Sequence, residues 1–216
     1  MATVHFKKRL VISLLFVSLS IMCTAQIKAV TEHGDEVILR TDGTWPYADS
    51  KAEKATKIDT SHISFIKNEK ASFLVKSNKL SCGVYIDPKK WSFSKNKTDD
   101  ASEIGFTLKE KDGYGMLITE KIEIPFETLK AAALSNAKDV APDVSIVKEE
   151  YRKVNDRFVL MLQMAGTLSG IRFMYFGYYY SSPNGTVQLI TYTSSNLFKD
   201  YADDLEEFLN GFVITQ

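Results

Sequence analysis

Alternating apolar and polar positions, typical of β-strands, recur through most of the chain after residue 70. Turn-forming residues such as Lys111-Asp112-Gly113 separate several of these runs, which favours antiparallel neighbours. The pattern predicts strands over 72–76, 83–86, 91–94, 104–109, 115–122, 145–153, 158–168, 171–180 and 186–193.

Two segments show the three- and four-residue spacing of amphipathic helices instead. The first helix is predicted to begin at Pro125, whose fixed φ suits a first helical turn, and to continue towards Ala137. The second covers 196–210 with one apolar stripe, and Gly211 stands where a C-terminal glycine is common. We therefore expect an α+β fold: an antiparallel β-sheet covered by two main helices and preceded by a small N-terminal β-hairpin.

The first 25 residues have the pattern of a secretory signal peptide. Three basic residues at 7–9 precede an apolar run over 11–23, and small residues follow up to Ala25. Cleavage after Ala25 would leave Gln26 as the first residue of a periplasmic or secreted protein. The apolar run is shorter than a spanning helix needs, so no transmembrane anchor is expected after processing. Acylation at Cys23 is the less favoured alternative, because the preceding residue is not small.

Three further segments follow the predicted signal peptide. Residues 26–47 hold two short β-prone runs with turn residues, which predicts a hairpin. Residues 48–61 carry charges of both signs and little to bury, as a polar linker does. The main domain is then expected over 62–216. Within the hairpin, Asp42-Gly43-Thr44-Trp45 and Tyr47 resemble an N-terminal motif of secreted proteins of Bacteroidota, to which no chemistry is attached.

The balance of charges argues against a nucleic-acid partner. The chain has 27 basic and 27 acidic residues, and loss of residues 1–25 removes three basic and no acidic ones. The exported protein is therefore mildly acidic and has no dense basic block, which is unlike a nucleic-acid-binding protein. Cys82 is the one cysteine after residue 25, so no intrachain disulfide is expected.

The positions of the histidines exclude several enzyme classes. His5 lies in the predicted signal peptide, His33 in the hairpin and His62 at the edge of the main domain. Without a histidine in the domain core, Ser-His-acid and Cys-His sites are excluded, and so are zinc sites built from several Cys and His residues. We therefore expect no catalytic residue, no metal site and no cofactor.

Carboxylate pairs leave one enzymatic alternative open, a hydrolase of envelope polymers. Such an enzyme needs two carboxyl groups with separated pKa values at one cleft. The pairs on the second helix flank its apolar stripe and are expected to face solvent. The candidate pairs are Asp99-Asp100, Glu149-Glu150, Asp203-Asp204 and Glu206-Glu207.

The densest aromatic segment covers 173–180. Strand alternation places Tyr175 and Tyr179 on one face and Tyr178 and Tyr180 on the other. A strand that is apolar on both faces is typical of a central strand covered on both sides. The alternative is that these four tyrosines meet a protein or glycan partner. A third hypothesis is a small-ligand pocket between sheet and helix, lined by the tyrosines.

The order of the segments resembles the Mog1/PsbP-like fold. The residues that carry the resemblance are Tyr85-Ile86-Asp87-Pro88-Lys89-Lys90-Trp91, Ile122-Glu123-Ile124-Pro125, Gly177-Tyr178-Tyr179-Tyr180-Ser181, Gly185-Thr186-Val187-Gln188-Leu189 and Phe208-Leu209-Asn210-Gly211. The resemblance implies an α+β domain, in most members non-enzymatic, that binds a partner or supports a larger assembly. The sequence therefore predicts a non-enzymatic partner-binding or assembly-support module of the cell envelope. The particular partners of other members are not carried over, because a shared fold transfers architecture better than function.

Overall fold

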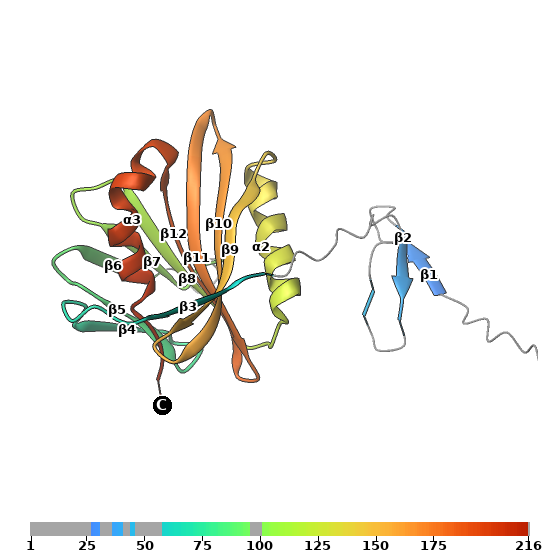
Figure 1. Cartoon of the computed structure of the whole chain (residues 1–216), viewed down its shortest axis with the longest axis horizontal. Coiled ribbons are helices and arrows are strands. Elements are labelled where there is room, and N and C mark those ends of the chain that lie inside the picture. The colour runs from blue at the N-terminus through green and yellow to red at the C-terminus, as the bar shows by residue number, and fades with distance from the viewer. Residues whose placement is uncertain (1–26, 31–35, 41–43, 46–57, 96–100, 216) are drawn as a thin grey trace, which may run out of the picture. The chain divides into compact units, whose positions relative to one another are not determined.

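The chain divides into two compact units, Met1–Thr56 and Lys57–Gln216 (Figure 1). In the first unit, β1 (Ile27–Val30) and β2 (Glu36–Leu39) pair antiparallel. The predicted signal peptide, its cleavage after Ala25 and most of the predicted linker lie outside the described residues, so the domain bounds stay a prediction. The computed structural model describes residues 27–30, 36–40, 44–45, 58–95 and 101–215.

Eight strands of the second unit form one large sheet, in the order β3-β9-β10-β11-β12-β8-β7-β6. Short turns join β7 to β8, β9 to β10 and β11 to β12, as the turn residues predicted, and a further tight turn joins β10 to β11. Each strand that the alternating pattern predicted is present, with its ends moved by at most two residues. The bounds are β3 Thr60–Phe65, β6 Trp91–Lys95, β7 Ile104–Leu108, β8 Gly113–Glu120, β9 Ser145–Val154, β10 Arg157–Leu168, β11 Ile171–Ser182 and β12 Gly185–Ser194.

This sheet is mixed, so the prediction of an antiparallel sheet was wrong. β3 forms one edge and runs parallel to β9, with Thr60 opposite Tyr151 and Phe65 opposite Val154. Turn residues predict pairing only between strands that a short loop joins, whereas two parallel strands need a long connection. Here five strands and a helix separate β3 from β9 along the chain. β3 also begins inside the stretch that was expected to be linker.

The second unit also contains a separate three-stranded sheet, which was not predicted, so the unit is mostly sheet. This small sheet has the order β13-β5-β4, with bounds Phe212–Ile214, Cys82–Ile86 and Phe73–Lys76. Gly211 leads into β13, and its carbonyl accepts a hydrogen bond from the Tyr85 amide at 2.8 Å. A Cβ at Gly211 would lie 2.0 Å from the Tyr85 carbonyl oxygen, so close backbone approach requires glycine there.

Both predicted helices are confirmed, as α2 (Phe126–Val140) and α3 (Ser195–Leu209). Leu205 of α3 packs in the same cluster as Tyr178, whereas Leu129 of α2 packs with Tyr179. Successive residues of a strand point to opposite faces, so the two helices lie on opposite faces of the large sheet (Figure 1). Within the described part of the chain, neither helix has the length and apolar character needed to cross a membrane.

Candidate functional site

The structure separates the four tyrosines that the sequence singled out. Tyr178 and Tyr179 are each 1% exposed, under α3 and α2 respectively. Tyr180 is half-buried and packs against Phe212, with ring centroids 5.5 Å apart. Tyr175 is half-buried on the α2 side. β11 is thus a central strand covered on both faces along part of its length, and Tyr178 and Tyr179 do not reach the surface.

Tyr178 belongs to a buried polar cluster around Arg152. The Arg152 side chain, 4% exposed, forms ion pairs with Glu150 at 2.7 Å and Glu206 at 2.6 Å. Its Nη1 donates to the Tyr178 hydroxyl at 2.9 Å, and that hydroxyl donates to Asn210 Oδ1 at 2.8 Å. Burial raises the pKa of Tyr178, so the hydroxyl stays protonated. The cluster ties β9 and β11 to the end of α3, which is a structural role.

Tyr175 lies in a row with two further tyrosines, Tyr192 and Tyr114, on the α2 side of the sheet. Tyr192 of β12 lies opposite Tyr175 of β11 and Tyr114 of β8 in the strand register. The Tyr114 and Tyr192 rings stack with centroids 5.4 Å apart and planes at 23°, and the Tyr192 and Tyr175 centroids are 6.0 Å apart. We call these three residues, with half-buried Met116 and Ile118 of β8, the tyrosine face.

The β8 part of the tyrosine face is open, because no described residue of β8 packs with α2. The described apolar residues that pack with α2 come from β9 to β12 and from segments next to the helix, and none comes from β8. Along β8, the residues turned towards α3 are buried, whereas Tyr114 on the other face is 36% exposed. The result is a row of aromatic and apolar side chains on a sheet face with no helix over β8.

The hydroxyls of this row differ in their surroundings. A hydrogen bond with Asp112 raises the pKa of Tyr114. Burial raises the pKa of Tyr175 and of Tyr192. All three are therefore neutral hydrogen-bonding groups near pH 7, set on apolar rings. The sequence pointed to Tyr175 but missed Tyr114 and Tyr192, because an isolated tyrosine in an alternating strand does not reveal which neighbours it stacks on.

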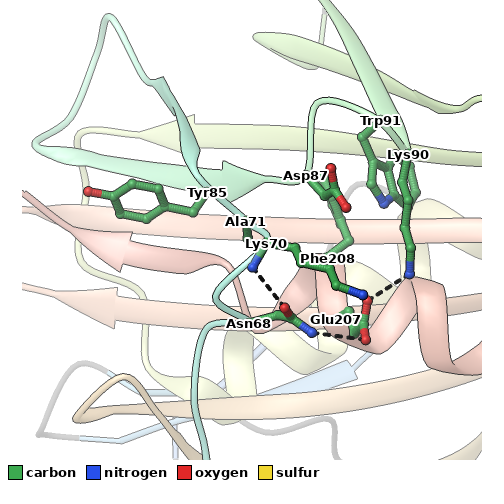
Figure 2. A pocket seen from close by; sticks show the side chains of 9 residues that line it. All are labelled: Asn68, Lys70, Ala71, Tyr85, Asp87, Lys90, Trp91, Glu207 and Phe208. Atoms are coloured by element: carbon green, nitrogen blue, oxygen red, sulfur yellow. Dashed lines mark hydrogen bonds and ion pairs between the residues drawn. The ribbon is translucent and has the colours of Figure 1, made fainter.

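A small hollow lined by residues that include Tyr85, Trp91 and Phe208 is bridged by polar contacts (Figure 2). Lys90 Nζ lies 2.9 Å from a Glu207 carboxylate oxygen, and Asn68 Nδ2 donates to the other at 3.1 Å. Hydrogen bonds to Asp204 and Glu207 raise the pKa of Lys90. The enclosed volume is about 10 Å³, which is room for about one water molecule. We therefore do not regard it as a ligand site.

Three of the four carboxylates in the α3 pairs form ion pairs, but Asp203 is exposed and the Glu206 and Glu207 side chains remain 37% and 42% exposed. Asp204 lies between Lys90 at 2.6 Å and Lys111 at 2.5 Å. Burial raises the pKa of Asp204, but the hydrogen bonds from the two lysines outweigh it, and the pKa lies below its ordinary value. A general acid needs the opposite shift. Asp99-Asp100 lies outside the described residues, and among the described ones no cluster of three or more Asp, Glu, His or Cys could hold a metal ion.

The arrangement of the main domain is similar to that of a cyanobacterial protein. The solution structure of cyanobacterial PsbP (CyanoP) from Synechocystis sp. PCC 6803 matches with a TM-score of 0.51 and 11% identity, over 66% of this chain and 91% of that chain. The domain has a PsbP-like fold. This confirms the Mog1/PsbP-like resemblance at the level of the fold, whereas the likeness to proteins of Bacteroidota stays a prediction.

Two other solved structures match this PsbP-like domain at the same identity. LpqN, involved in cell envelope biogenesis of Mycobacterium tuberculosis, matches with a TM-score of 0.46 and 11% identity, over 67% of this chain and 90% of that chain. PA94 of Pseudomonas aeruginosa, a protein of unknown function, matches with a TM-score of 0.43 and 11% identity, over 65% of this chain and 95% of that chain. No protein-family model matches the sequence, and no curated protein matches it.

Proposed function

We propose that the protein is a non-catalytic binding module of the cell envelope, exported to the periplasm or beyond, and that its tyrosine face docks on a protein partner. The signal-peptide pattern of residues 1–25 supports export. The open row of Tyr114, Tyr192 and Tyr175 is the observation that carries the binding role. Tyrosine is enriched at protein interfaces because one end of its side chain is apolar and the other is wet.

The ring geometry favours a protein over a glycan. A sugar ring packs against the exposed face of an aromatic ring. Here the near-parallel Tyr114 and Tyr192 rings, 5.4 Å apart, turn their faces towards each other. Side chains stand roughly perpendicular to a sheet, so the rings present edges and hydroxyls outwards. Such edges, beside the apolar Met116 and Ile118, match the mixed character of a protein interface.

The absence of catalysis is part of the proposal and has its own support. His62, the histidine within the described main domain, is exposed on the edge strand β3 and remote in the sheet order from the tyrosine face. The carboxylates of α3 are held by Lys90, Lys111 and Arg152 as ion pairs. Neither arrangement resembles an activated nucleophile or a poised acid and base.

Quantitative capture from the native envelope fraction tests the proposal. Immobilised wild-type protein should recover a reproducible protein partner, and Tyr114→Ser should reduce its recovery at least about tenfold, as loss of an interface hot spot does. Phe93→Ser is the matched control, because Phe93 is a similarly exposed aromatic, 40% against 36%, on the opposite face of the sheet. It should leave recovery unchanged.

Three outcomes would overturn the proposal. The first is repeated recovery of no protein. The second is equal loss of recovery with Tyr114→Ser and Phe93→Ser. The third is retention of the protein on protease-treated envelope polysaccharide with loss in Tyr114→Ser, which would identify a glycan partner instead. Thermal unfolding of both variants confirms that each is folded at the assay temperature.

A further inference from the structure

A second hollow lies between the two sheets of the main domain. One wall comes from the start of β5 and the end of β13, and the other from the β11–β12 hairpin. Its volume is about 280 Å³, close to the lower end of the range for small-molecule pockets. We call it the inter-sheet hollow. Its lining residues are Leu80, Ser81, Cys82, Tyr180, Ser182, Asn184, Gly185, Val187, Ile214 and Thr215.

The wall that contains Leu80 is held in place by a buried carboxylate. Glu103, 7% exposed, accepts hydrogen bonds from Ser77 Oγ at 2.7 Å and Thr119 Oγ1 at 2.6 Å, and another from the Asn78 amide. Ser77 Oγ in turn accepts the Leu80 amide at 3.1 Å. The loop between β4 and β5 is thus fastened to the large sheet, so this wall of the hollow is preformed.

The opposite wall depends on a glycine. Gly185 has φ of +140°, and a Cβ there would lie 2.5 Å from the Glu120 carbonyl oxygen and 2.8 Å from the Leu80 side chain. The hairpin therefore packs tightly against both the neighbouring strand and the fastened loop. Gly185 therefore allows the close approach of the hairpin to the loop at this point of the hollow.

The lining selects against charge. Among the described residues that line the hollow there is no Asp, Glu, Lys, Arg or His. Burial raises the pKa of the Cys82 thiol to about 12, so it is neutral at ordinary pH. Leu80, Val187 and Ile214 contribute apolar surface, and Ser182 and Thr215 contribute hydroxyls. A charged ligand would lose its hydration with no counter-ion in the lining, which is costly.

We propose that the inter-sheet hollow is a binding site for an uncharged amphiphile with an apolar body and one hydrogen-bonding end. Its volume of about 280 Å³ suits a small organic ligand. A short-chain or benzylic alcohol has this size and chemistry. This site shares no residue with the tyrosine face and does not depend on the proposed function.

Titration of the purified protein with benzyl alcohol, followed by amide chemical shifts, tests the site. Saturable shifts should appear at Cys82, Val187 and Ile214. Benzoate and benzylammonium, which have the same apolar body with a charge, should bind at least about tenfold more weakly because of the uncompensated desolvation. Ser182→Phe should weaken benzyl alcohol binding at least tenfold by filling the hollow.

The controls separate filling of the hollow from loss of structure. Ser94→Phe makes the same change at an exposed strand position outside the hollow, on β6, and should leave the titration unchanged. If Ser182→Phe does not fold, Thr215→Trp at the mouth of the hollow replaces it. Tyr114→Ser should bind benzyl alcohol normally. Absence of saturable shifts, equal affinity for benzoate, or normal binding by a folded filling variant would overturn the proposal.

Discussion

Replacement of Glu103 by glutamine should destabilise the protein, because it weakens the hydrogen bonds that hold the β4–β5 loop to the large sheet. The carboxylate accepts hydrogen bonds from Ser77, Thr119 and the Asn78 amide. A hydrogen bond to a charged group contributes about 1.5–3 kcal/mol, against about 0.5–1.5 kcal/mol for a neutral one. With three such bonds, the free energy of unfolding should fall by about 3 kcal/mol in Glu103→Gln. The NH2 group of the new side chain must also face one of the three donors, which cannot then form its hydrogen bond.

The pH dependence distinguishes the charge of Glu103 from its shape. Burial raises its pKa, but the hydrogen bonds from Thr119, Asn78 and Ser77 outweigh burial, and the pKa lies below its ordinary value of 4.5. Because the pKa is lower in the folded state than in the unfolded state, the contribution is complete above the unfolded pKa. It is lost as pH falls through the folded pKa. The gap between wild type and Glu103→Gln should be constant from pH 8 to about 5.5 and narrow below about 4.5.

Urea unfolding of both proteins at intervals from pH 8 to pH 3.5 measures this gap. Glu123→Gln is the matched control, because Glu123 is exposed, and its free energy of unfolding should change by less than about 0.5 kcal/mol. A Glu103→Gln loss below about 1 kcal/mol at pH 7 would refute the assigned role. So would a gap of the same size at pH 7 and pH 3.5, because the ionised form would then contribute nothing specific.

Two other substitutions test the packing of the domain, with urea unfolding as the measurement. Arg152→Met should lose about 3 kcal/mol, because it removes the charge-assisted hydrogen bonds that the buried Arg152 side chain makes to Glu150, Glu206 and Tyr178, and a loss below about 1 kcal/mol would contradict this. Gly211→Ala should lose about 3 kcal/mol, because the new Cβ meets the Tyr85 carbonyl oxygen and the backbone must move. Gly170→Ala, with φ of +80° and nothing within 4 Å, should lose only about 1 kcal/mol from backbone strain. Equal losses at the two glycines would rule out the close contact at Gly211 as the cause.

Local patterns were sufficient to predict both helices of the main domain and its strands except β3 and β13, which were not predicted. Apolar alternation and turn residues depend on neighbours within a few positions, so strands such as β10 (Arg157–Leu168) and the helix α3 (Ser195–Leu209) were predicted within two residues. The parallel pairing of β3 with β9 was not predicted. It joins Thr60 to Tyr151, and no local pattern reports contacts between residues so far apart.

The candidate surface shows the same division. Alternation placed Tyr175 and Tyr178 on opposite faces of β11, as the structure has them. It did not tell which tyrosine a helix would cover, because that depends on where α2 ends across the sheet. The sequence did not predict that Tyr114 and Tyr192 lie together, because their stacking depends on the register of β8 and β12.

The amino-acid sequence alone predicted both helices and the strands of the main domain other than β3 and β13, and it shows the lack of histidine beyond position 62. It also predicted export, because basic, apolar and small residues follow one another in residues 1–25. Only the tertiary structure decided that Tyr178 is buried while Tyr114 is exposed, and that a hollow remains between the two sheets. The physical reason is that burial is set by neighbours from distant segments, whose packing no local pattern encodes.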